Sequence, residues 1–210
     1  MLNMELDTHF RKMKITVISM LVVCIGVFAS CKTAEDRTCL KSIGKDAELE
    51  IPLPEFDKLL LREQMEFVLI QDSTDKLVIK GGENLIKHIS WTVDLDNVLE
   101  IKNRNKCSFL RKLNKKVKVE IHFTSLSNLH YEGTEPLSNI DTLNVPFFVM
   151  LIRDGAGSVK LNLRAMVVEA DISHGWGDYT IAGQTNYARI AARSNGFCDV
   201  TNLKIRDSVY

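Results

Sequence analysis

Five charged residues in the C-terminal half of the chain could carry out acid–base chemistry if the fold brought them together. They are Lys160, Glu169, Asp171, Arg189 and Arg193. A cationic side chain acting as a base beside carboxylates is one way to cleave an acidic polysaccharide. By analogy with β-helices that host polysaccharide lyases, a carbohydrate-active enzyme is one alternative function.

Asp171 and Asp178 flank His174, which could suggest a metal or acid–base site. Side chains on an alternating strand need not converge, however, and no second histidine stands at ligand spacing. The histidines at 88, 122 and 130 are isolated in the sequence, and the Gly-Ala-Gly and Gly-Trp-Gly triplets precede no helix that could bind a phosphate. We therefore predict no catalytic residue, no metal and no cofactor.

A strand–glycine–strand pattern recurs through the C-terminal half and would have to position any site. Its leading glycines are Gly155, Gly175 and Gly196, and a weaker copy before them holds Gly133. The pattern recurs every ~20 residues, and self-similarity at such a period is typical of a repeat architecture. We predict an all-β fold, with a right-handed β-solenoid-like stack of ~20-residue rungs over residues 125–210. An antiparallel meander with accidentally spaced glycines is the alternative.

Apolar and polar residues alternate on both sides of each glycine turn, which puts one set inside and the other in solvent. We expect the glycines to supply the positive φ of each corner. The residues predicted to point inward are Val159, Leu161, Leu163, Val168, Ala170, Ile172, Tyr179 and Ile181.

Residues 49–124 are rich in strands but not repetitive, and we predict an N-terminal β cap that closes one end of the stack. The spacing of Phe56, Leu59 and Leu60 predicts an amphipathic helix over residues 56–64. The predicted strands cover residues 67–70, 76–80, 89–93, 98–101 and 117–123, and a further strand is expected at 203–205.

Aromatic residues beside the glycines could form a binding platform. Ala156, Trp176 and Phe197 line up in the three sequence copies, so Trp176 and Phe197 would lie on successive rungs. Such a pair could hold a sugar ring or a protein partner. The alternative is that the two rings only cover the corner.

A stretch rich in basic residues could grip phosphates or acidic glycans, or could be a solvated loop between two strands. No acidic residue occurs within the stretch. Its members are Lys102, Arg104, Lys106, Arg111, Lys112, Lys115, Lys116 and Lys118.

Residues 1–30 are predicted to be a lipoprotein signal peptide rather than part of the fold. The apolar run over residues 15–29 is short for a bilayer span of about 30 Å. It ends in Val27-Phe28-Ala29-Ser30-Cys31, which resembles the lipobox of bacterial lipoproteins. That resemblance implies cleavage before Cys31 and a lipid on Cys31, followed by a tether over residues 31–48. An ordinary secretory signal is the alternative.

The charge balance limits the classes of partner that the chain could bind. The chain has 27 basic and 27 acidic residues, so no excess of positive charge indicates a nucleic-acid partner. Besides Cys24 and Cys31, three cysteines remain, and they are predicted to be small, mostly buried hydrophobic residues. They are Cys39, Cys107 and Cys198.

The mature chain resembles the head GIN domain proteins, autotransporter-adhesin-like lipoproteins of Bacteroidetes type. The similar segments are residues 67–70, 77–85, 117–121 and 126–129, together with the corner glycines. The resemblance implies a β-solenoid on the cell envelope with no established enzymatic activity.

We expect a non-enzymatic, lipid-anchored protein of the bacterial cell envelope, outer-membrane associated and facing the periplasm or the surface. Its membrane contact would be the lipid anchor, and its ligand a surface glycan or protein. A periplasmic sensor or scaffold is a further alternative.

Overall fold

The computed structural model describes residues 42–105 and 116–209. The predicted signal peptide, Cys31, most of the predicted tether, Cys39 and Cys107 lie outside the described residues, as do Lys106, Arg111, Lys112 and Lys115. No helix among the described residues is long and apolar enough to cross a membrane.

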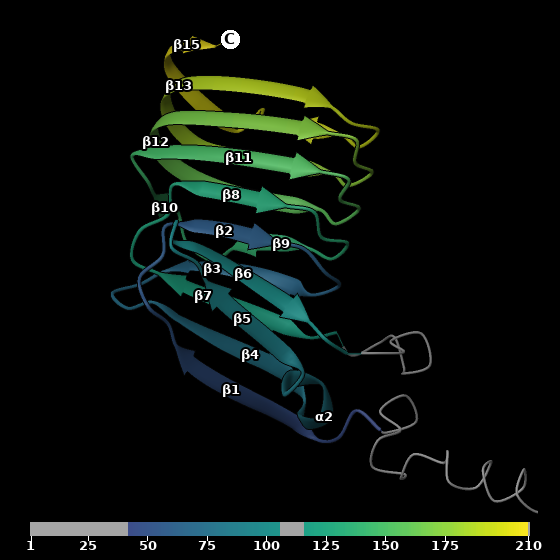
Figure 1. Cartoon of the computed structure of the whole chain (residues 1–210). Coiled ribbons are helices and arrows are strands. Elements are labelled where there is room, and N and C mark those ends of the chain that lie inside the picture. The colour runs from purple at the N-terminus through teal and green to yellow at the C-terminus, as the bar shows by residue number, and fades with distance from the viewer. Residues whose placement is uncertain (1–41, 106–115, 210) are drawn as a thin grey trace, which may run out of the picture. The chain divides into compact units, whose positions relative to one another are not determined.

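The described fold is all-β with one short helix (Figure 1). In the N-terminal half, the elements are β1 (Asp46–Pro52), β2 (Lys58–Leu61), β3 (Glu66–Gln71), β4 (Lys76–Gly82), α2 (Glu83–Ile86), β5 (Ile89–Val93), β6 (Val98–Asn103) and β7 (Lys118–Phe123). They continue with β8 (Asn128–Tyr131), β9 (Leu137–Asn139), β10 (Leu143–Asn144), β11 (Phe147–Arg153), β12 (Val159–Ser173), β13 (Tyr179–Arg193), β14 (Cys198–Asp199) and β15 (Leu203–Val209).

The C-terminal strands pair in parallel, and three of the pairs share one offset over most of their length, whereas β14 pairs with β13 at an offset one residue shorter. Val159 lies opposite Tyr179, Phe147 opposite Val167, and Gly183 opposite Leu203, so the same sequence separation recurs in each pair. This separation equals the distance along the chain from Gly155 to Gly175, which confirms that the glycine period is a structural one. The antiparallel meander is wrong for these strands.

Two long strands join the two faces of the sheet. β12 and β13, each of 15 residues, pair with each other along their length, and both faces of the stack in Figure 1 contain part of them. The first part of β12 pairs with β9, while its second part pairs with β11. The sheet therefore curls strongly around one interior.

The N-terminal strands continue the parallel pairing and add antiparallel strands at one end. β2 pairs in parallel with β6 and β8, and β3 pairs in parallel with β7 and β9. The antiparallel pairs are β1–β4, β4–β7 and β5–β6. All of the strands predicted at 67–123 and at 203–205 are confirmed.

The helix predicted over residues 56–64 is wrong, because this segment contains β2. Leu59 and Leu61 are buried on one side of that strand, which lies between β6 and β8. Pairing on both edges outweighs the helical spacing of three apolar residues.

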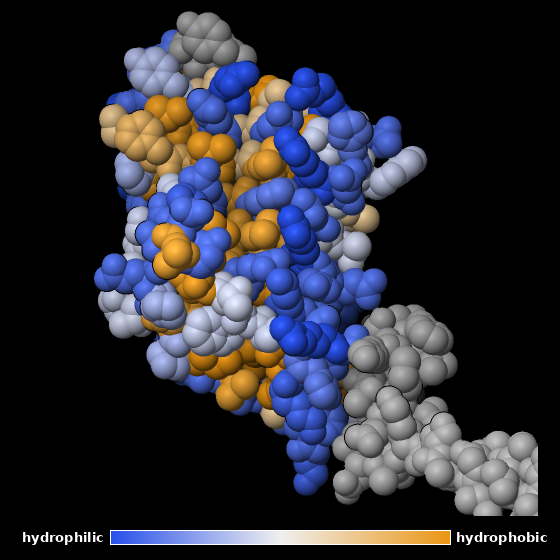
Figure 2. Space-filling view, in the orientation of Figure 1, coloured by the Kyte–Doolittle hydropathy of each residue, from blue (hydrophilic) through white to orange (hydrophobic). Residues whose placement is uncertain are grey.

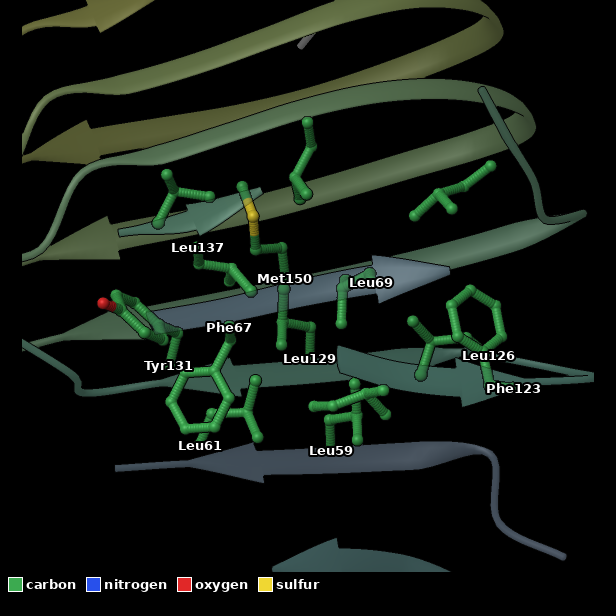
Figure 3. Close-up of a cluster of buried hydrophobic side chains, with 14 of the residues drawn as sticks. Leu59, Leu61, Phe67, Leu69, Phe123, Leu126, Leu129, Tyr131, Leu137 and Met150 are labelled. Atoms are coloured by element: carbon green, nitrogen blue, oxygen red, sulfur yellow. The ribbon is translucent and has the colours of Figure 1, made fainter. Parts of the chain in front are cut away.

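The interior between the two faces is a single apolar cluster (Figure 3). Phe67, Leu69 and Leu61 are fully buried there, and the labelled side chains of β2, β3, β7, β8 and β9 point into it. All eight residues that the alternation predicts to be inward are buried: Val159, Leu161, Leu163, Val168, Ala170, Ile172, Tyr179 and Ile181.

The corner glycines serve close approach rather than positive φ. The residues with positive φ at the first two corners are Asp154 and His174, and Gly155 and Gly175 are not among the positive-φ glycines. A Cβ on Gly177 would lie under 3.0 Å from the Gly157 carbonyl oxygen of the preceding turn. The expected role of these glycines is therefore corrected: they let successive turns stack backbone on backbone.

Candidate binding face and its pocket

The third corner is displaced from the register that the sequence copies predict. The backbone N–H of Trp176 donates to the Gly155 carbonyl at 3.0 Å, and in the next turn it is Asn195 that donates to the Gly175 carbonyl, at 2.9 Å. Asn195, not Phe197, therefore occupies the position equivalent to Trp176. The predicted alignment of Phe197 is wrong, because the corner between β13 and β14 is shorter than the one before it.

Phe197 instead lies beside Asp178. Its N–H donates to the Asp178 carboxylate at 3.0 Å, and its carbonyl accepts from the Tyr179 N–H at 2.8 Å. Cys198 consequently lies opposite Tyr179 on the adjacent strand. Trp176 and Phe197 are 76% and 71% exposed, so both rings are available to a ligand.

Four of the five charged residues with potential for acid–base chemistry meet on the outward face of β12 and β13. Arg189 Nη1 lies 4.0 Å from the Glu169 carboxylate, and Arg193 Nη2 lies 3.3 Å from that of Asp171. Lys160 is apart from them, on the first part of β12, opposite Ser138 and Thr180.

These four side chains line a pocket of about 220 Å³ on the outer surface of the sheet. β11 forms one wall and β13 the other, with β12 between them. The complete lining is Val149, Met150, Leu151, Glu169, Ala170, Asp171, Arg189, Ala191 and Arg193.

Large exposed apolar side chains are concentrated in the half of the chain that builds this face. Of the nine such residues in the part of the chain that the structure describes, seven lie between positions 140 and 197: Ile140, Phe147, Val149, Met166, Trp176, Tyr187 and Phe197. Phe147, Val167 and Tyr187 are directly opposite one another on adjacent strands. In Figure 2, apolar side chains form a band with hydrophilic side chains along one side, on the face where β2, β8 and β11 lie.

Phe147 and Tyr187 are functional candidates that the sequence-based interpretation missed. Both lie in the register of the repeat, on the side of the strand opposite Phe148 and Ala188, which are buried. The alternation that identified the inward residues could therefore have identified this outward row.

His174 does not form a metal or acid–base site with its neighbours. It is exposed at a corner with φ of 57°, and its N–H donates to the Arg193 carbonyl at 3.2 Å. Within residues 42–105 and 116–209, no group of three or more histidine, cysteine or acidic side chains is placed to hold a metal ion. His122 contacts Asp72 at 2.9 Å, and His130 contacts Glu132 at 2.7 Å.

The described part of the basic stretch pairs with acidic residues that lie outside the stretch in the sequence. Lys116 pairs with Glu135, and Lys102 lies 2.7 Å from Glu100. Lys118 is 3.6 Å from Glu120, which also accepts from Lys80 at 2.7 Å.

The pKa values of Glu120 and Cys198 are shifted from their usual values. Burial of the Glu120 carboxylate would raise its pKa, but the Lys80 hydrogen bond and the neighbouring positive charges hold the pKa below its usual value. Burial and the nearby Asp199 raise the pKa of the Cys198 thiol, which keeps it protonated and poorly nucleophilic. Cys198 is half-buried and is in no disulfide bond among the described residues.

Comparison with known proteins places this fold in a family. The family model described as "Putative auto-transporter adhesin, head GIN domain" matches residues 55–209. A search of the curated proteins finds no match.

Solved structures from Bacteroides and Parabacteroides species share the fold. A protein from Bacteroides fragilis, named a putative adhesin, has a TM-score of 0.68 at 20% identity, covering 77% of this chain and 73% of that one. A protein from Parabacteroides distasonis, named a putative lipid binding protein, has a TM-score of 0.56 at 17% identity, covering 78% and 76%. A putative adhesin from Parabacteroides merdae has a TM-score of 0.52 at 15% identity, covering 81% and 78%.

These structures are distant from the chain in sequence and support the fold, while the family model spans most of the described residues. The chain belongs to the head GIN domain family of adhesin-like proteins.

Proposed function

We propose that the protein is a lipid-anchored, non-enzymatic binding module of the bacterial cell envelope. Its rungs form a right-handed β-solenoid that presents a rigid outer face to a glycan or protein. The observation that carries this proposal is the row of apolar residues across adjacent strands, in which the exposed Phe147 and Tyr187 lie on either side of Val167. Exposed apolar surface gathered in one region is typical of an interaction site.

Membership of an adhesin-like family supports binding as the activity, and the anchor follows from the predicted lipid on Cys31. Strands paired on both sides keep the face rigid, so little ordering entropy is lost when a partner binds. A face held in this way needs no conformational change to engage a ligand.

The charged groups argue for binding rather than cleavage. Lys160 lies on the first part of β12, away from Glu169 and Asp171, so it is not placed to act as a base beside them. Glu169 and Asp171 are about half exposed, whereas catalysis by charge stabilisation works best in a site that excludes water. A periplasmic scaffold would share the same face, and protease accessibility on intact cells separates it from a surface adhesin.

Removing both corner aromatics tests the platform. We expect Trp176→Ala combined with Phe197→Ala to weaken binding to cells or glycans by about tenfold or more, because exposed aromatic anchors carry much of a binding energy. Binding is measured on a glycan array and on intact cells with purified protein.

Leu95→Ala is the matched control, since Leu95 is 103% exposed at the turn between β5 and β6. It should leave binding unchanged. Unchanged binding by the folded double variant would discard the platform.

A further inference from the structure

In the pocket on the outer face, the acidic and the basic side chains come from different strands. Its two carboxylates, of Glu169 and Asp171, both come from β12, and its two guanidinium groups, of Arg189 and Arg193, both come from β13. Neighbouring strands are about 4.8 Å apart. An acidic column and a basic column therefore run side by side at that spacing.

The ion pairs across the columns are exposed to solvent, and Arg193 Nη2 donates to both carboxylate oxygens of Asp171. The Arg189–Glu169 distance is 4.0 Å, and the Arg193–Asp171 distance is 3.3 Å. The two arginine side chains are 73% and 70% exposed, and the carboxylates are 48% and 45% exposed. Exposed pairs of this kind contribute little to stability, because water and salt screen them. A ligand can therefore separate them at little cost.

The third strand of the pocket is apolar. Val149 and Leu151 of β11 lie directly opposite Glu169 and Asp171, and Ala191 of β13 lies opposite Asp171 on the other side. The pocket thus offers carboxylates, guanidinium groups and an aliphatic wall within about 220 Å³. That volume suits a small headgroup or one sugar substituent.

We propose that this pocket binds a zwitterionic group, with its ammonium at Glu169 and Asp171 and its phosphate or carboxylate at Arg189 and Arg193. A lone anion would meet two carboxylates, and a lone cation would meet two guanidinium groups. A group carrying both charges a few ångströms apart satisfies both columns with charge-assisted hydrogen bonds. This assignment rests on the proposed function, since it names the ligand chemistry of the binding face.

The first test uses small probes on the full-length protein. O-Phosphoethanolamine carries both charges, while inorganic phosphate and ethylamine carry one each. Titration followed by NMR or calorimetry is expected to give saturable binding of phosphoethanolamine at least about tenfold tighter than of either single-charge probe, because hydrogen bonds to charged groups are among the strongest. Equal binding of phosphate, or no saturation by phosphoethanolamine, would overturn the proposal.

Two charge-removing variants sharpen the test. Arg189→Gln with Arg193→Gln, and Glu169→Gln with Asp171→Asn, should each reduce phosphoethanolamine binding by about tenfold or more. A simple anion site would instead bind more tightly once the two carboxylates are removed, and that result contradicts the zwitterion. Lys160→Gln is the control, since Lys160 is exposed on β12 outside the pocket, and all variants are compared by circular dichroism.

Two binding experiments distinguish a lipid headgroup from a soluble or glycan-linked group as the source of the zwitterion. Binding of the Cys31→Ala protein, which lacks the proposed anchor, to phosphatidylethanolamine vesicles but not to phosphatidylglycerol vesicles would identify a lipid headgroup. Binding of free phosphoethanolamine alone would identify a soluble or glycan-linked group. Both support the pocket. If no zwitterion binds while cell binding persists, the pocket assignment fails and the proposed function stands. If the protein binds zwitterions but neither cells nor glycans, the pocket assignment stands and the proposed function fails.

Discussion

Gly177→Ala is expected to destabilise the fold by about 3 kcal/mol or more, because an added Cβ overpacks a site that cannot relax. The Cβ would lie under 3.0 Å from the Gly157 carbonyl oxygen and close to the Gly157 carbonyl carbon. Both are backbone atoms held in the stack, so neither can rotate away. Thermal unfolding followed by circular dichroism should show a Tm lower by about 6–12 °C for a domain of this size.

Gly81→Ala is the matched control. Its Cβ would first meet the Ile86 side chain at 3.3 Å, which is a tight but movable contact. The gain from a less flexible unfolded chain offsets part of that cost, so the Tm should change little. A Gly177 variant as stable as the Gly81 variant would show that backbone stacking of the corners does not hold this fold together.

Phe67→Ala is expected to cost about 3–5 kcal/mol in the free energy of unfolding, through lost burial and the cavity left behind. Phe67 is 0% exposed, on a strand between β7 and β9, and its side chain is part of the interior shown in Figure 3. Urea unfolding at neutral pH measures the loss directly.

Phe197→Ala is the same substitution on the surface, at a ring that is 71% exposed. It should cost less than about 0.5 kcal/mol, as surface substitutions do. A loss comparable to that of Phe67→Ala would mean that Phe197 covers the corner structurally, and the binding platform would have to be abandoned. The pair therefore tests the core and the platform together.

The strands and the period were predictable from the sequence, because both follow from local alternation and spacing. Val159, Leu161 and Leu163 occupy every second position, and burial of that set requires only that neighbouring strands pair in register. The helix over residues 56–64 failed for the opposite reason. Leu59 and Leu61 are buried by β6 and β8, two strands distant in sequence, and no local pattern contains that information.

The corners were less predictable. A glycine compatible with positive φ and a glycine needed for close backbone approach look the same in a sequence, and only the stacked carbonyl of Gly157 distinguishes them at Gly177. The register of Phe197 failed because the third corner is shorter than the second. The second corner has two glycines, Gly175 and Gly177, and the third has only Gly196. The spacing of the glycines alone does not show that Gly196 stacks on Gly177 rather than on Gly175.

The charged lining of the candidate pocket could be predicted from the sequence, but its apolar wall could not. Alternation put Glu169, Asp171, Arg189 and Arg193 on one outward face, and the structure brings them together. Lys160 also points outward, but it lies on the other side of the bend in β12, where the buried positions change from odd to even numbers. The contribution of β11 to the wall depends on the pairing of a third strand.

Intact mass and membrane partitioning, measured on the full-length protein expressed in a bacterial host beside Cys31→Ala, test display from a membrane most directly. We predict that the wild-type chain begins at Cys31, carries the mass of a lipid and sediments with membranes. The Cys31→Ala protein should lack the lipid mass and lose membrane association. A soluble wild-type protein that retains residues 1–30 would contradict lipid-anchored display.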